Sequence, residues 1–372
     1  MQKLAQSWLI LLLGGSPFWL GLDSFLGEFP IFTLALFAGV AADRFDRRRL
    51  LIGSQFMQMS CAFALCFLFA THSVHVWQIL ALSFVTGTAQ AFGSPAYQSL
   101  IPALVPREQL PQAIAMNSIQ FNLARLIGPV LGGAVLSTLG AAWCFGLNGV
   151  SFVAVIVTLL LISVRYDFAK TSDTVFESMK HGVQFIRRRE NMVLLFVVSF
   201  ACTYLGIPIL TFLPVFAKDI YHGDAKTFTL LLSVQALGAI AGAVVVAARG
   251  RKTGLGRSAL LGLIALAFCL SAFAWSPSIA VACVFLFFGG MALITCFAML
   301  SSLVQLIATD DMRGRVMSVY NIAFRGGMPI GSLVAGALIP HFGARNVVGA
   351  HGVVLGVLAL YLLLAHKKLA AI

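Results

Sequence analysis

Charged residues are scarce in this sequence, and their scarcity excludes an ordinary soluble domain. Only 10% of the 372 residues are Asp, Glu, Lys or Arg, and 60% are hydrophobic. A soluble domain averages about 25% charged residues. Acidic residues are fewer than basic ones, with 13 Asp and Glu against 25 Lys and Arg, which gives a net charge of +12. The composition therefore predicts an all-α polytopic membrane protein.

Further absences exclude several classes of function. The sequence has no Gly-rich phosphate-binding loop followed by Lys, which argues against an ATP-driven pump, and it carries no other enzyme motif. All seven cysteines lie in apolar runs away from His or carboxylate groups, so we expect buried thiols and neither a metal site nor a cofactor. The basic residues lie in short loops and not on one amphipathic face, which indicates no nucleic-acid partner.

The most informative polar stretch is the segment 39–49, which reads Gly-Val-Ala-Ala-Asp-Arg-Phe-Asp-Arg-Arg-Arg between two long apolar runs. A turn this short between two membrane spans must be polar, and its excess of arginine predicts a cytoplasmic location. Its candidate functional residues are Gly39, Asp43, Arg44, Arg47 and Arg48. From these residues alone, the loop could also be a charge cluster that only sets the orientation of the chain.

The distribution of basic residues predicts the topology. If the loops alternate between the two sides, nineteen Lys and Arg residues fall on one side and three, Lys218, Lys226 and Arg345, on the other. The basic side is expected to be cytoplasmic, and it includes the C-terminus and the one long polar segment, 165–190. Val175, Met179, Val183 and Ile186 recur there at nearly helical spacing. We therefore expect an amphipathic helix in this linker.

An internal repeat predicts two halves. Gly39 and Gly242, Gly87 and Gly290, and Gly128 and Gly331 are each 203 positions apart. This constant offset indicates two pseudo-symmetric six-helix bundles: an N-terminal half, 1–164, the cytoplasmic linker, 165–190, and a C-terminal half, 191–372. The apolar stretch 1–13 is too short for a full span. We therefore expect either a shortened first helix or a true start upstream.

Four charged residues lie inside the predicted spans: Asp23, Glu28, Arg125 and Arg325. Counted from the cytoplasmic ends of their helices, Glu28 and the two arginines come near mid-membrane, while Asp23 is expected nearer the outer rim, in contact with solvent. Two interpretations remain open: mutual neutralisation that fixes packing, or a change in Glu28 protonation that couples proton entry to solute exit. Polar candidates for a cavity are Gln90 and Asn122.

Several motifs together resemble one family of transporters. They are 5–8 (Ala-Gln-Ser-Trp), the loop 39–49, 94–96 (Ser-Pro-Ala), the run 125–133, 213–216 (Leu-Pro-Val-Phe) and 313–318 (Arg-Gly-Arg-Val-Met-Ser). This set is similar to the bacterial branch of the major facilitator superfamily that contains enterobactin exporters and related effluxers. The resemblance implies the major facilitator fold, and it makes the loop 39–49 a cytoplasmic latch between the halves. Gly128 and Pro129 resemble the antiporter signature of the superfamily, and with Gly132 and Gly133 they predict close helix packing.

The leading hypothesis is a proton-coupled exporter of a small apolar, siderophore-like or drug-like compound that works by alternating access. It would act as a monomer in the bacterial cytoplasmic membrane, with protons, a small-molecule substrate and membrane lipids as partners. Two alternatives remain: an uncoupled facilitator or importer, and a non-transporting membrane scaffold or truncated product.

Overall fold

The structure is a computed structural model that describes residues 1–34, 37–38, 41, 45–162, 175–249, 254–309 and 312–366. Over these residues the regular structure is helical, with no strand. The chain divides into two compact units: unit 1 comprises Met1–Gly15 and Leu22–Val175, and unit 2 comprises Ser16–Gly21 and Phe176–Ile372. Eight of the described helical segments are long and apolar enough to cross a membrane. The predicted all-helical, multi-pass membrane architecture is therefore confirmed.

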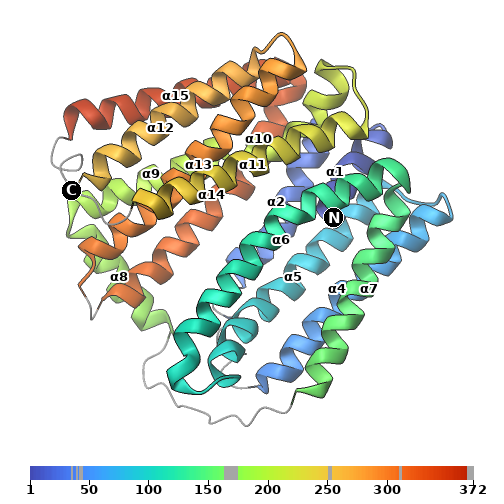
Figure 1. Cartoon of the computed structure of the whole chain (residues 1–372), viewed down its shortest axis with the longest axis horizontal. Coiled ribbons are helices and arrows are strands. Elements are labelled where there is room, and N and C mark those ends of the chain that lie inside the picture. The colour runs from blue at the N-terminus through green and yellow to red at the C-terminus, as the bar shows by residue number, and fades with distance from the viewer. Residues whose placement is uncertain are drawn as a thin grey trace. The chain divides into compact units, whose positions relative to one another are not determined.

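Unit 1 is built from helices of 11 to 29 residues in its described part. They are α1 (Gln2–Leu12), α2 (Pro17–Thr33), α4 (Arg47–Ala70), α5 (Val76–Leu100), α6 (Leu110–Thr138) and α7 (Ala141–Leu161), with the start of α2 grouped in unit 2. Two short 3₁₀ turns, Ile101–Ala103 and Arg107–Gln109, join α5 to α6. Helix α4 packs between α5 and α7 (Figure 1). Their buried contact includes Leu51, Leu100 and Leu159, so apolar side chains from three helices form this part of the core.

Unit 2 repeats this plan. Its helices are α8 (Val175–Arg187), α9 (Glu190–Gly206), α10 (Pro208–Val215), α11 (Ala225–Arg249), α12 (Leu255–Ala274), α13 (Ile279–Ile307), α14 (Arg313–Phe342) and α15 (Ala344–Ala365). A π-helical turn, Phe216–Ile220, extends α10, so that 190–220 forms one candidate span. Helix α12 packs against α13 and α15, as α4 packs against α5 and α7. Helix α8 lies in the part of the linker where an amphipathic helix is predicted, while 163–174 is outside the described residues.

The offset of 203 residues recurs in the helix boundaries. Helices α5, α6 and α7 begin at Val76, Leu110 and Ala141, and α13, α14 and α15 begin 203 positions later, at Ile279, Arg313 and Ala344. The last turn of each half also repeats, because Gly140 and Gly343 precede α7 and α15 with φ of 89° and 80°. Glycine adopts this backbone conformation without steric cost. The sequence repeat is therefore a repeat of helices and of the turn that joins the last two.

The outer surfaces of the helices suit a lipid environment. Large apolar side chains stay exposed along them, among them Phe67 and Leu161 in unit 1 and Phe268 and Val357 in unit 2. Exposed apolar surface of this extent is expected where helices face hydrocarbon and is rare on soluble monomers. The polar groups inside the helices are therefore the exceptions that need an explanation.

Candidate functional site

The first polar cluster joins three helices of unit 1 around Asp23. Its carboxylate, on α2, accepts hydrogen bonds from Gln6 Nε2 of α1 at 2.8 Å and from Ser83 Oγ of α5 at 2.5 Å. Gln6 also donates to Ser83. Gln6 and Ser83 are 4% and 8% exposed, so these bonds satisfy polar groups that water hardly reaches. Asp23, expected in contact with solvent from the sequence, is half-buried and held by two neighbours.

The second carboxylate of α2 forms an ion pair. Lys3 Nζ of α1 lies 2.7 Å from Glu28 Oε1. The Lys3 side chain is 80% exposed and the Glu28 side chain 20% exposed, so the pair joins a largely buried carboxylate to an exposed ammonium group. Helix α1 thus contacts both acids of α2, through Lys3 and through Gln6.

Close packing positions α2 against α5 between the two acids. A methyl group added at Gly87 of α5 would collide with the carbonyl oxygen of Gly27 on α2. The absence of a side chain at Gly87 lets the two backbones approach closely, as small residues do between membrane helices. This approach brings Ser83, one turn before Gly87, within reach of Asp23.

The structure does not join the two predicted arginines to Glu28. Arg125 lies in α6, but its side chain is outside the described part of the structure, as is that of Asn122. Arg325 lies in α14 of unit 2 with an exposed side chain. Gln90, the other cavity candidate, is exposed on α5. An acid–base cluster of Glu28 with these arginines therefore stays a prediction.

The described part of the basic loop forms hydrogen bonds to two helix ends within unit 1, the last turn of α7 and the first turn of α4. Arg48 donates from Nε to the Leu159 carbonyl and from Nη2 to the Leu160 carbonyl, both at 2.6 Å. These carbonyls belong to the last turn of α7, where a cation is favourable. Asp46 caps α4 by accepting from the backbone N–H of Arg48 and Arg49. Arg47 lies in the first turn of α4, while Gly39, Asp43 and Arg44 are outside the described residues.

The glycine-rich run of α6 includes one close backbone contact. A methyl group at Gly132 would lie 2.9 Å from Met1 Cα, so α6 packs tightly on the start of α1. At Gly128 a methyl group would meet nothing within 4 Å, and Pro129 lies within the helix without ending it. Gly133 is buried beside Gly132. The run therefore holds α6 against α1, the helix that carries Lys3 and Gln6.

A whole-chain comparison decides the family. Proteins described as transmembrane secretion effectors, a group within the major facilitator superfamily, match residues 1–371. The chain belongs to this family. Its members and its structural neighbours are transporters and not enzymes.

Individual relatives are distant but consistent with the family. The staphyloferrin A transporter of Staphylococcus aureus is 24% identical over 249 residues, which cover 66% of this chain and 62% of that protein. Macrolide efflux protein A of Streptococcus pyogenes is 24% identical over 56% of this chain and 52% of that protein. The chain thus aligns with little more than half of the length of these two relatives. The enterobactin exporter EntS of Citrobacter koseri is 24% identical over 94% of this chain and 84% of that protein.

Solved structures agree on the fold. The crystal structure of the nucleoside transporter NupG superposes with a TM-score of 0.76, covering 99% of this chain and 95% of that chain at 13% identity. This likeness confirms the predicted major facilitator fold, and at this identity it carries no information on substrate.

Sequence reasoning missed Lys3, Gln6 and Ser83 as partners of the two acids. The available signal was the spacing on α1, since residues three apart on a helix lie on one face. Gln6 also belongs to the Ala-Gln-Ser-Trp motif by which the transporter family was recognised. The sequence placed Glu28 by depth alone, and depth does not tell which neighbouring helix an acid faces.

Proposed function

We propose that this member of the secretion effector family is a proton-coupled exporter of small siderophore-like or drug-like compounds that works by alternating access. Family membership supports transport, and the relatives named for staphyloferrin A, macrolides and enterobactin support the substrate class. The efflux and exporter relatives support the outward direction. The observation that carries the coupling is the pair of carboxylates on α2, each bonded to α1.

The chemistry of coupling follows from the Lys3–Glu28 pair. A proton that binds Glu28 removes its negative charge and with it the attraction to Lys3, so the contact between α1 and α2 weakens. If the pair forms in only one access state, the proton affinity of Glu28 differs between the states. A ligand shifts a conformational equilibrium only through such a difference in affinity. Asp23, Gln6 and Ser83 would then hold the rest of the α1–α2 contact in place.

We also propose the cellular arrangement of the exporter. The excess of basic residues on one set of loops supports a bacterial cytoplasmic membrane location with the linker and C-terminus in the cytoplasm. The halves 1–164 and 191–372, joined by the linker 165–190, would rock about the substrate as one monomer. The segment 39–49 would close the cytoplasmic side.

Transport into inverted membrane vesicles tests the proposal. Vesicles that contain the protein are energised by respiration and given a radiolabelled macrolide, enterobactin or staphyloferrin A, the compounds for which the relatives are named. A proton-coupled exporter accumulates one of these compounds above its external concentration, and a protonophore abolishes the accumulation. Equilibration without accumulation would instead support a facilitator. No uptake of any compound above that of empty vesicles would favour a non-transporting scaffold.

A further inference from the structure

The first half of α14 carries a stripe of exposed polar positions. Gly314, Ser318, Asn321 and Arg325 are separated by four, three and four positions, so they lie on one face of the helix. All four are exposed. Arg325 lies about 18 Å along the helix axis from the start of α14 at Arg313. The stripe therefore brings a positive charge close to the middle of a helix that is long and apolar enough to cross a membrane.

The second half of α14 exposes apolar side chains instead. Ile330, Val334 and Leu338 recur every four residues and are 39%, 36% and 38% exposed. Apolar side chains suit contact with hydrocarbon, whereas a guanidinium inside a membrane is costly unless it faces water or an anion. We therefore expect the face that carries Arg325 to line an aqueous path and the later apolar face to contact lipid.

Packing against α9 determines the direction of the polar stripe. A methyl group at Gly327 would collide with Thr203 Oγ1 of α9, and one at Gly331 would collide with the Tyr204 carbonyl oxygen. The two glycines thus mark the side of α14 that lies against α9. Arg325 is two positions before Gly327, which is a rotation of about 200° around the helix. Arg325 therefore lies on the side opposite α9, in agreement with its exposure.

Two side chains of the stripe have unused hydrogen-bond donors. Among the described residues, neither Arg325 nor Asn321 makes a hydrogen bond or an ion pair. Ser318, in contrast, donates to the Gly314 carbonyl oxygen. A guanidinium has five N–H donors and an asparagine amide has two. Because residues four apart are neighbours on a helix surface, the donors of Arg325 and Asn321 can reach the same ligand.

An aromatic surface adjoins these donors. Phe324 is three residues after Asn321, so the two side chains are also neighbours on the helix. Its ring contacts that of Phe297 of α13 edge-on, with centroids 4.6 Å apart, and stacks on Tyr320 at 5.7 Å. Phe324 and Phe297 are half-buried, so part of each ring is accessible. The stripe thus places donors for an anion beside an apolar surface.

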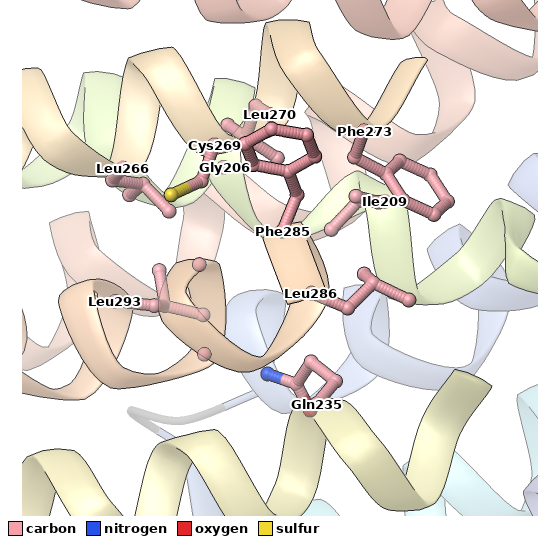
Figure 2. A pocket seen from close by; sticks show the side chains of 12 residues that line it. Gly206, Ile209, Gln235, Leu266, Cys269, Leu270, Phe273, Phe285, Leu286 and Leu293 are labelled. Atoms are coloured by element: carbon pink, nitrogen blue, oxygen red, sulfur yellow. The ribbon is translucent and has the colours of Figure 1, made fainter. Parts of the chain in front are cut away.

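A small apolar pocket inside unit 2 is not an alternative site for a solute. It lies among α9 to α13 and is lined mainly by Leu and Phe side chains (Figure 2). Leu286, one of the lining residues, is 203 positions after Ser83 of the polar cluster in unit 1. The pocket has a volume of about 20 Å³, which is room for about one water molecule. A solute is therefore more readily bound at the exposed stripe of α14.

We propose that Arg325 and Asn321 bind the carboxylate of the exported compound, with its apolar part against Phe324. This assignment rests on the export proposed above and specifies the substrate class as small organic anions. A guanidinium pairs with both oxygens of a carboxylate through two parallel N–H···O bonds. Asn321 donates a further hydrogen bond to one of these oxygens. The bound anion neutralises the charge of Arg325, which favours a carboxylate over a neutral compound of the same shape.

Binding of para-fluorobenzoate to the purified full chain in nanodiscs tests the site. This probe has a carboxylate on an apolar ring, and para-fluorobenzamide is the neutral probe of similar size. Broadening of the fluorine NMR signal measures binding, with empty nanodiscs as the blank. We expect the parent to broaden the signal of para-fluorobenzoate saturably and that of para-fluorobenzamide no more than empty nanodiscs do.

Two substitutions separate the charge of Arg325 from its geometry. Arg325→Gln removes the charge and should weaken binding of para-fluorobenzoate about ten- to hundredfold. Arg325→Lys keeps the charge but loses the planar group, so binding should weaken about three- to tenfold, and this variant keeps the test decisive if Arg325→Gln does not fold. The matched control is Arg313→Gln, which removes an exposed arginine at the start of the same helix and should bind as the parent does.

Cysteine reactivity tests whether this face of α14 contacts water. Asn321→Cys should react with an anionic and with a cationic methanethiosulfonate reagent faster than the parent does. Val334→Cys, on the apolar half, should react with neither, because the reactive thiolate does not form in hydrocarbon. A guanidinium nearby attracts the anionic reagent and repels the cationic one. Adding Arg325→Gln to Asn321→Cys should therefore lower the ratio of the two rates about three- to tenfold.

Equal affinity of the parent, Arg325→Lys and Arg325→Gln for para-fluorobenzoate would overturn the proposal. So would an Asn321→Cys variant that reacts with neither reagent. Binding is measured here without transport, so the two proposals fail separately. Export that persists without para-fluorobenzoate binding would reject this site alone, whereas binding without export of any compound would reject the function proposed above and leave the anion site in place.

Discussion

The hydroxyl of Ser83 is the smallest group on which the polar cluster depends. It donates to Asp23 at 2.5 Å and also accepts from Gln6, so one oxygen joins α1, α2 and α5. At the corresponding place in unit 2, Leu286 lines an apolar pocket. The hydroxyl is therefore a feature of unit 1 and not of the repeated fold.

Replacing Ser83 by Ala should destabilise unit 1. The substitution leaves Asp23 without one of its two donors, and a hydrogen bond to a charged group contributes about 1.5–3 kcal/mol. We expect a lower midpoint of thermal unfolding for the purified protein, with Ser83→Thr, which keeps the hydroxyl, close to the parent. Equal midpoints for the Ala and Thr variants would show that the hydroxyl does not support the cluster.

At single residues, the sequence predicted the two acids but not their partners. The sequence identified Glu28 and Asp23 as acids within apolar helices; Asp23 bonds to Gln6 and Ser83, Glu28 pairs with Lys3, and a role of either acid in coupling stays a prediction. It did not identify their partners, because a linear sequence gives the depth of a side chain but not the direction in which its helix faces. Lys3 and Gln6 could be assigned to these acids only once α1 and α2 were placed side by side.

At the scale of elements, the helix boundaries were largely readable from the sequence. The apolar runs of the sequence predict spans near 278–306 and 312–340, and the helices α13 and α14 run 279–307 and 313–342. Long apolar runs bounded by Gly, Pro and charged residues determine such limits. The small apolar pocket of unit 2 was not predicted, because empty space arises from how α9 to α13 pack and leaves no pattern in the sequence.

Arg48 should stabilise the end of α7 through its two hydrogen bonds to carbonyl oxygens. Arg48→Lys keeps the charge but loses the planar group that reaches both Leu159 and Leu160. We expect about 1 kcal/mol lower stability and faster hydrogen exchange in the last turn of α7. Arg49→Lys is the matched control, since the Arg49 side chain is 88% exposed. If both variants exchange at the same rate, Arg48 does not cap this helix.

Asp224 should make the start of α11 sensitive to acid. Its carboxylate accepts from the backbone N–H of Lys226 at 3.0 Å and of Thr227 at 3.1 Å. The bond from Thr227, above all, lowers the pKa of Asp224 below its usual value. The contribution of the cap is therefore complete above the unfolded-state value, near pH 3.9, and is lost as the pH falls through the lower folded-state value.

Two substitutions separate the cap from its charge. Asp224→Asn keeps a capping side chain, so we expect near-parental stability at pH 7 and a flatter fall of the thermal midpoint between pH 5 and pH 3. Asp224→Ala should cost about 1 kcal/mol at pH 7, since it removes the cap. Thermal unfolding across this pH range checks both expectations. An Asn variant with the parental acid dependence would assign that dependence to other groups.

At the scale of the whole molecule, the distribution of charge makes a topological prediction. Reporter fusions at Gly182 in α8 and at the C-terminus should both report the cytoplasm, and a fusion at Gly223, before α11, should report the opposite side. The reason is the division of nineteen basic residues on one set of loops against three on the other. A cytoplasmic signal from Gly223 would contradict the assignment.

The sequence predicted the repeat and the class of protein because both are expressed over the whole chain. A constant offset and a low charge content can be recognised even where single residues deviate from the pattern. The cluster around Asp23 depends instead on the rotation of three helices about their own axes. The helix starts at Val76 and Ile279, 203 positions apart, repeat the offset of the sequence, while the division into 1–164, 165–190 and 191–372 stays a prediction.

The central claim is that Glu28 couples proton movement to export. A proton-exchange assay of Glu28→Gln tests it most directly. The compound that most raises the thermal midpoint of the purified protein is added to inverted vesicles whose acid interior is reported by acridine orange. The parent should exchange luminal protons for the compound, so the fluorescence should rise. Glu28→Gln, which mimics the protonated state, should bind the compound but give no rise at equal protein level.

Full proton exchange by the folded Glu28→Gln variant would contradict the coupling role of Glu28. Loss of folded protein in that variant, restored by Lys3→Gln in addition, would instead show that the Lys3–Glu28 pair is a structural contact and not a proton carrier.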